Sequence, residues 1–235
     1  MAIADLLAKL VELKSQLVAN LSSMGVTADE SEKLNTLVPK VLECKTDVIW
    51  SQGTVSKEVT SVKIPSGVTS IGYDAFSSCK SLASITIPDS VTSIGGWAFD
   101  NCSSLASITI PDSVTSIGYR AFYRTALLAN QTGVKYADTW VIDCNEDVTS
   151  VEIKDGIRGI ADSAFSNCSS LASITIPGSV TSMGSEAFIH CESLANIYYK
   201  GTEEQWNAIT KGSNWNSSMG SNVEGGTVIT YNYTG

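Results

Sequence analysis

The sequence predicts an α/β solenoid, in which short repeats stack through parallel β-sheet. One 15-residue stretch occurs unchanged at 81–95 and 104–118, and it returns at 170–184 with two substitutions, Gly178 and Met183. A period of 23 residues is marked by the phenylalanines: Phe76, Phe99 and Phe122, then Phe165 and Phe188. Repetition at this step indicates a stack, because one such unit cannot bury its apolar face without neighbours.

Each unit is predicted to contain two short extended segments. Leu82, Ile85 and Ile87 alternate with polar residues, which is the pattern of a half-buried strand. The strand ends at a proline, which has no amide hydrogen for a sheet, and a second extended segment follows at 91–94. We expect Gly95 to allow a tight turn. The next Ala-Phe pair is expected on a single helical or 3₁₀ turn, with Phe99 in the core.

The fourth repeat is predicted to carry an insertion. Phe122 and Phe165 are 43 residues apart, which is 20 more than one period, and Ile153 also lies 43 residues after Ile110. Because the flanking repeats keep their spacing, we place an insertion of 20 residues near 124–147.

Three segments are expected along the chain. Residues 46–199 hold five repeats. Residues 1–45 carry apolar side chains at helical spacing, which predicts a helical hairpin as an N-terminal cap. Residues 200–235 are expected to form a C-terminal cap, in which Thr202 begins a short helix containing Trp206 and a last strand lies within 227–233. Such caps would cover the open ends of the stack.

The repeats resemble the BspA-type leucine-rich repeats of bacterial surface proteins. The shared features are the Ala-Phe pair, a Cys-x-x-Leu step and an Ile-Pro-x-x-Val-x-x-Ile-Gly run, and they extend over about 48–199. The resemblance implies a parallel-sheet solenoid with a binding or adhesive role, toward a protein or a glycan. It identifies no catalytic residues.

The first 43 residues also resemble the helical segments that begin many bacteriophage tail-associated proteins. This resemblance rests on Gly-Val-Thr-Ala-Asp-Glu at 25–30 and Leu-Asn-Thr-Leu-Val-Pro at 34–39. It leaves an alternative function open, as a structural or display component of a phage or prophage particle. A homo-oligomer would then form through the N-terminal helices, at Leu6, Leu10, Leu13 and Leu17.

Charge and hydropathy exclude two classes of partner. The 15 basic and 24 acidic residues give a net charge of -9, whereas nucleic-acid binding needs a basic surface. No apolar run approaches the ~20 residues that span a bilayer, so we expect no membrane insertion. The N-terminus lacks the pattern of a signal peptide, while the family resemblance points to the cell surface or outside the cell. Localisation is therefore undecided at this stage.

The residues with reactive side chains suggest no enzyme, cofactor or metal site. Four cysteines occupy one register of the repeats and are expected to be buried free thiols rather than zinc ligands: Cys79, Cys102, Cys168 and Cys191. Pairing of Cys44 with Cys144 is left open. His190 is the only histidine, and its neighbour Cys191 belongs to the buried register, so a Cys-His catalytic pair is not expected.

The copies differ most around the Ala-Phe pair, and these differences predict a binding edge. The flanking pairs at 73–74, 96–97, 119–120, 162–163 and 185–186 vary, as do the two residues after each phenylalanine. Stacking would align aromatic and arginine side chains, types that are enriched at binding hot spots. The candidate partner-binding residues are Tyr73, Trp97, Tyr119, Arg120, Tyr123 and Arg124. The alternative is that these turn positions tolerate change and diverged after duplication.

Overall fold

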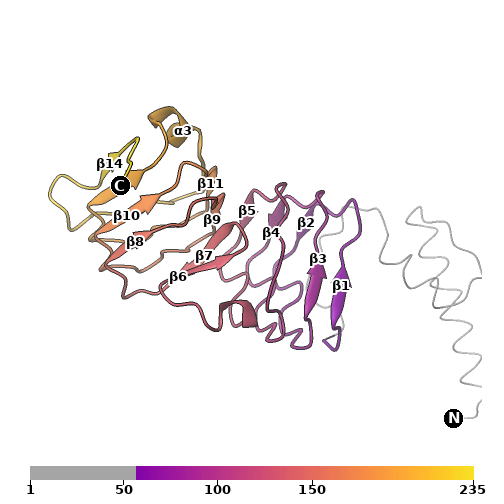
Figure 1. Ribbon diagram of the computed structural model, residues 1–235. Helices are drawn as coiled ribbons and strands as arrows, with labels where there is room; N and C mark the ends of the chain where they lie inside the picture. The colour runs from indigo at the N-terminus through magenta and orange to yellow at the C-terminus, as the bar shows by residue number, and fades with distance from the viewer. Residues whose placement is uncertain (1–56) are drawn as a thin grey trace, which may run out of the picture.

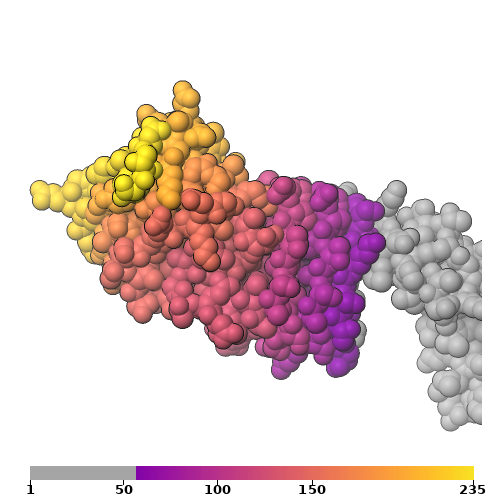
Figure 2. Space-filling model, in the orientation of Figure 1, coloured from indigo at the N-terminus to yellow at the C-terminus, as the bar shows by residue number. Residues whose placement is uncertain are grey.

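The computed structural model describes residues 57–235, which form one elongated solenoid (Figure 1). Successive repeats lie side by side along its length, so the colours of the space-filling view follow chain order from β1 to the C-terminus (Figure 2). The predicted hairpin at 1–45, its possible oligomer contact and Cys44 lie outside the described residues.

Two parallel ladders run along the solenoid, as predicted. In the first, β1 (Ser61–Lys63) pairs with β3 (Ser84–Thr86). Beyond the insertion the first ladder contains β8 (Ser150–Glu152), β10 (Ser173–Ile176), β12 (Asn196–Tyr199) and β14 (Val228–Thr230). The second ladder begins with β2 (Ser70–Ile71), β4 (Ser93–Ile94) and β5 (Ser116–Ile117). It resumes with β7 (Trp140–Cys144), β9 (Gly159–Ile160), β11 (Ser182–Met183) and β13 (Thr210–Lys211).

Stacked phenylalanines form the centre of the core. Phe76 lies 5.3 Å from Phe99, and Phe99 lies 5.2 Å from Phe122, measured between ring centroids. Beyond the insertion, Phe165 and Phe188 stack at 5.0 Å. All five rings are almost completely buried, so each repeat covers the apolar face of the next.

Hydroxyl groups join the repeats at the surface of this core. The Ser113 hydroxyl donates to the carbonyl oxygen of Val91 at 2.7 Å, and Ser179 donates to Ile157 at the same distance. Ser90 makes the equivalent bond one repeat earlier. Each bond spans 22 residues of sequence, one fewer than the period, because each serine bonds to the residue that follows its own register in the preceding repeat. The identical residues of the repeats thus have an identical role.

The glycine of the repeat is required for close packing rather than for its turn conformation. Gly95 does not have a positive φ. A Cβ atom on Gly95 would lie 2.7 Å from the backbone of Gly72, and one on Gly118 would lie 2.4 Å from the amide of Gly96. The expected turn does follow Gly95, whose carbonyl accepts from the Ala98 amide at 3.4 Å, but the position needs glycine for the contact between stacked backbones.

The turn that carries the Ala-Phe pair is not helical, which corrects an expectation. Residues with a positive φ interrupt it on both sides, at 57° for Trp97 and 57° for Asn101. Such left-handed residues cannot continue a right-handed helical or 3₁₀ turn. Within the described chain, the only helices are the 3₁₀ helix η1 (Ala126–Leu128) and α3 (Glu203–Ala208).

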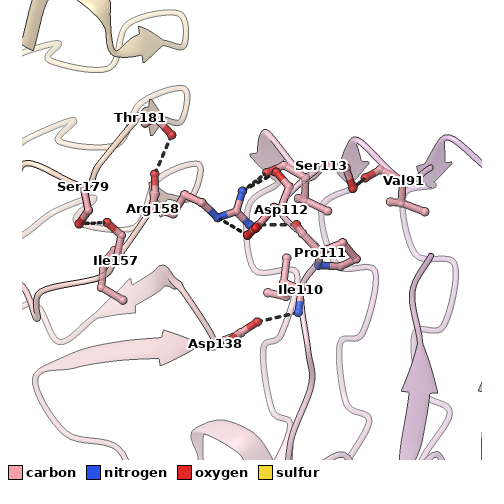
Figure 3. Close-up of polar contacts among 11 residues, drawn as sticks. Val91, Ile110, Pro111, Asp112, Ser113, Asp138, Ile157, Arg158, Ser179 and Thr181 are labelled. Carbon is pink, nitrogen blue, oxygen red and sulfur yellow. Dashed lines mark hydrogen bonds and ion pairs between the residues drawn. The ribbon is translucent and has the colours of Figure 1, made fainter. Parts of the chain in front are cut away.

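The insertion forms an antiparallel hairpin and interrupts the first ladder. β6 (Val134–Ala137) pairs with β7, and β7 enters the second ladder beside β9. The segment at 105–110 forms no strand, although its sequence is identical to that of β3 and its neighbours. Its Ile110 amide donates instead to the Asp138 side chain, Oδ2, at 2.8 Å (Figure 3). In an uninterrupted repeat, the Ile64 amide reaches the Thr86 carbonyl of the next strand.

Arg158 joins the two halves of the solenoid across this interruption. Its guanidinium donates from Nη1 to the carbonyls of Asp112 (2.7 Å) and Val114 (3.1 Å), and from Nη2 to that of Pro111 (2.9 Å) (Figure 3). The Arg158 guanidinium also lies over the Trp140 ring, with Cζ 5.9 Å from its centroid. A side chain thus replaces the regular contacts between repeats at this point.

The last residues extend both ladders. β13 pairs with β11, and β14 pairs with β12. Helix α3 follows β12 and precedes β13 in the chain, and it begins at Thr202, whose hydroxyl accepts from the Gln205 amide at 3.2 Å. Trp206 on this helix is buried, 5.2 Å from the Tyr199 ring. The helix start at Thr202 and the strand within 227–233 agree with the sequence-based expectations for these elements.

Candidate partner-binding edge

Five of the six candidate residues form one contiguous cluster on the turn edge of the second and third repeats. The Trp97 ring makes edge-to-face contacts with Tyr119 at 5.7 Å and Tyr123 at 5.9 Å. The Arg120 guanidinium carbon lies 5.3, 4.9 and 4.8 Å from the centroids of Trp97, Tyr119 and Tyr123 respectively. We call this the aromatic–arginine edge: Trp97, Tyr119, Arg120, Tyr123 and Arg124.

The side chains of this edge are accessible to a partner. Tyr119 is 40% exposed, Arg120 and Arg124 are exposed, and Trp97 and Tyr123 are half-buried. Tyr73, the sixth candidate, lies at the border of the cluster. It is 62% exposed, and its ring packs beside Gly96: a Cβ atom added to Gly96 would lie 3.5 Å from the Tyr73 ring. The structure thus places Tyr73 next to the edge, but without a ring contact to it.

Three residues of the edge have a backbone conformation that disfavours them. Trp97, Arg120 and Arg124 have φ values of 57°, 53° and 56°. The left-handed region costs roughly 1–2 kcal/mol for an ordinary L-residue and is most tolerant of Gly, Asn and Asp. The other repeats carry polar residues at these two registers, most of them small: Asp74, Ser78, Asn101, Ser163, Asn167, Glu186 and His190. Large side chains are thus present where local conformation favours small ones.

Asp100 is the carboxylate beside the two arginines. Desolvation by burial raises the pKa of Asp100, and the charges of Arg124 and Arg120 offset part of that rise. Its Oδ1 atom is buried and has no hydrogen-bond partner among the described residues. The carboxylate therefore lies in the field of the guanidinium groups without occupying their N–H donors.

An open hollow of about 460 Å³ adjoins Tyr119. It is lined by Tyr119, Asp162, Ser163, Ser166, Ser185 and Glu186. A smaller depression connects it to the edge, since Tyr119, Arg120, Tyr123 and Asp162 all contribute to that wall. Burial raises the pKa of Asp162 against the opposing effect of its hydrogen bond from the Ser185 amide, 2.8 Å from Oδ1.

The hollow comes from residues that the sequence singled out only as variable pairs. The pairs 162–163 and 185–186 differ from their counterparts, but nothing in their residue types marked them as neighbours of Tyr119. The contact arises because β7 enters the second ladder: the Asp162 amide bonds to the Ile117 carbonyl at 2.9 Å, and this brings the repeat after the insertion against the one before it.

The reactive side chains of the described region do not gather into a site. The four cysteines of the repeat register are buried, as predicted. Three of them, Cys102, Cys168 and Cys191, are free thiols, and so is the buried Cys144. His190 is exposed on the turn. Residues 57–235 contain no group of three or more side chains able to hold a metal ion, and none of their helices has the length and apolar character needed to cross a bilayer.

Several solved structures are similar to this chain. One is a leucine-rich repeat protein of T. pallidum, 26% identical over 68% of this chain and 71% of that one, with a TM-score of 0.35. A second is a leucine-rich cell surface protein from Faecalibacterium prausnitzii (26% identity, 66% and 63% coverage, TM-score 0.32). A third is a leucine-rich repeat protein from Bacteroides ovatus (25%, 66% and 42%, 0.34). In the second and third, the match covers less than two thirds of the solved chain.

The search of curated proteins returned no match. The family model of the BspA type leucine-rich repeat region matches in six copies, over residues 54–132 and 143–219. The gap between the two stretches, 133–142, falls on β6 and most of β7, which is where the inserted hairpin departs from the repeat. With its repeats matched on both sides of that hairpin, the chain belongs to the BspA type leucine-rich repeat family.

Proposed function

We propose that this chain is a non-enzymatic binding module that contacts a protein or glycan partner through the aromatic–arginine edge. Membership of a leucine-rich repeat family supports a repeat surface used for binding. The resemblance of the repeats to those of bacterial surface proteins leads us to propose that it acts at the cell surface or outside the cell.

One observation carries the assignment of the edge: three aromatic rings surround Arg120 on an exposed turn. Tryptophan, tyrosine and arginine dominate binding hot spots because they combine large contact area with directional polar groups. Their presence at left-handed backbone positions adds to the case. Divergence without selection would favour residues that relieve this conformation, whereas Trp97 and both arginines retain its cost.

The test compares two triple variants of the full chain on a combined protein and glycan array. Trp97→Ala/Tyr119→Ala/Tyr123→Ala removes the rings of the edge. Lys63→Ala/Ser84→Ala/Thr86→Ala removes three exposed side chains of the first ladder instead and serves as the control. We expect the edge variant to lose the binding that the wild-type chain shows, with an unchanged circular dichroism spectrum. Retained binding by the edge variant, or loss in the control alone, would reject this surface.

A further inference from the structure

We infer that the aromatic–arginine edge binds the carboxylate of an acidic sugar within an otherwise neutral glycan. This inference rests on the proposed function and specifies the chemistry of the partner. It starts from the arginines, because the chain contains only three: Arg120, Arg124 and Arg158. Arg158 is committed to the carbonyls of the junction.

The two other guanidinium groups have unoccupied donors. Within residues 57–235, the Arg120 and Arg124 side chains make no hydrogen bond or ion pair, and both guanidinium groups lie over aromatic rings. Arginine is a strong donor for planar anions, with paired N–H groups that match a carboxylate. Two exposed arginines without hydrogen-bonded acceptors, on a chain with a net charge of -9, form a local anion site.

The aromatic rings hold these groups in place. Both guanidinium carbons lie against the same ring, 4.8 Å from the Tyr123 centroid for Arg120 and 4.9 Å for Arg124. Asp100, the carboxylate beside them, makes no hydrogen bond to either guanidinium, so the N–H donors of both arginines are left for a further anion. Because stacking restricts the side chains before binding, less conformational entropy is lost when a ligand arrives.

The neighbouring hollow favours a sugar over a peptide. Three of its six lining residues are serines and two are carboxylates, Asp162 and Glu186, so it offers acceptors for hydroxyl groups and only one aromatic ring. A peptide would need an apolar pocket for an anchoring side chain. Sugar rings instead combine C–H faces, which pack on Tyr119, with hydroxyl donors for the serines and carboxylates.

The charged side chains of the edge and the hollow also define where the acidic sugar of the ligand must lie. The arginines attract one carboxylate, whereas Asp162 and Glu186 repel a second negative group in the hollow. A polyanion such as a heparin fragment would meet that repulsion. The fitting ligand carries one acidic sugar at the arginines and neutral sugars beyond it. Uronic acids and sialic acids share this chemistry.

The experiment titrates the full chain with matched oligosaccharides by calorimetry. The probes are a uronic-acid-terminated trisaccharide, a sialyl trisaccharide, the carboxyl-reduced form of each, a heparin hexasaccharide and a hexaglutamate peptide. We expect one of the two acidic trisaccharides to bind, and carboxyl reduction to weaken it about tenfold or more, since a charge-assisted hydrogen bond is lost. The better of the two identifies the source of the acid.

Variants of charge complete the design. Arg120→Gln/Arg124→Gln should abolish the preference for the carboxylate, whereas Lys63→Gln/Lys80→Gln removes the same charge from exposed positions elsewhere and should leave it intact. Equal binding of acidic and reduced trisaccharides, or tighter binding of hexaglutamate or heparin, would overturn the inference. If no saccharide binds while the array still shows edge-dependent binding, the inference fails and the proposed function stands. If the ring variant also retains all binding, both fail.

Discussion

The Nη1 atom of Arg158 donates to the carbonyl oxygen of Val114 at 3.1 Å, the carbonyl that a serine hydroxyl would reach in an uninterrupted stack. One repeat earlier, Ser113 bonds in this way to Val91, and beyond the insertion Ser179 bonds to Ile157. At the junction, the position that corresponds to these serines is residue 156, which is glycine. The long side chain two residues later therefore replaces the missing hydroxyl.

Replacing this arginine should weaken the coupling between the two halves. Arg158→Met keeps an unbranched side chain but removes the guanidinium from the Trp140 ring and leaves three carbonyls without their charged donor. We expect a loss of about 2–4 kcal/mol in the free energy of unfolding. The urea transition should broaden or split as well, since stability in stacked repeats depends on each interface.

Ser179→Ala provides the matched control, because it removes one 2.7 Å bond between regular repeats. It should cost about 1 kcal/mol and leave a single transition. Equal losses in the two variants, both with one sharp transition, would show that Arg158 is no more than an ordinary contact between repeats.

A second prediction concerns Gly159, where the serine that the other repeats carry at this register would destabilise the fold. The second ladder has serine at this register in Ser70, Ser93, Ser116 and Ser182. At Gly159, a Cβ atom would lie 2.4 Å from the ring of Trp140, its partner on β7. Gly159→Ser restores the repeat but forces the buried indole to move, at a cost of about 1–3 kcal/mol.

Thermal unfolding can measure this cost. The control is Gly178→Asp, which restores the residue of the exact copies at a position where a Cβ would meet its nearest atom at 3.3 Å and where no ring is involved. We expect that change to lower the melting temperature less than Gly159→Ser. A Gly159→Ser protein as stable as the wild type would mean that Trp140 does not occupy this position.

These two sites show what the sequence could and could not predict. The strands, the phenylalanine stack and the buried cysteines follow from the 23-residue period, because identical residues meet identical neighbours. Arg158 and Gly159 depart from the repeat, and that departure is visible in the sequence. Their partners are not, since Pro111 lies 47 residues before Arg158 and depends on the path of an inserted hairpin.

The candidate edge was predictable for the same reason, and its hollow was not. Trp97 and Arg120 are one period apart, and Tyr119 directly precedes Arg120, so stacking alone brings the three residues together. Asp162 and Glu186 reach Tyr119 only because Asp162 bonds across the junction to Ile117. The left-handed backbone of the turns was also missed, since an Ala-Phe pair flanked by variable residues has no pattern that distinguishes it from a helical turn.

Alkaline pH should destabilise the fold through its buried thiols. Burial raises the pKa of Cys102 and of Cys191 to about 12, from a reference of 9.0. Between these values the unfolded chain loses a proton that the folded chain keeps. Stability is therefore complete below pH 9 and falls as pH rises toward 12, by about 1.4 kcal/mol per pH unit for each such thiol.

Urea unfolding at pH 8 to 11 under reducing conditions measures this slope. Cys102→Ala removes one of these thiol titrations, so the stability of the variant should fall less steeply than that of the wild type above pH 9. Taking the difference between the two proteins cancels the lysine and tyrosine titrations that they share. Parallel curves would contradict the assignment of the alkaline loss to Cys102.

The last prediction separates binding from folding at the aromatic–arginine edge. Arg124→Asn places at this register the residue that two other repeats carry, Asn101 and Asn167. Asparagine relieves the left-handed backbone, by about 1 kcal/mol, while the lost contact with Tyr123 costs about 0.5–1 kcal/mol. The free energy of unfolding should thus stay level or rise slightly, whereas binding of the acidic trisaccharide should fall.

His190→Asn is the matched control, because His190 has the same register with a φ of 58° but lies outside the edge. It should gain slightly more stability than the first variant, because it loses no ring contact, and it should match the wild type in affinity. If Arg124→Asn loses stability in proportion to its affinity, Arg124 supports the fold rather than the partner.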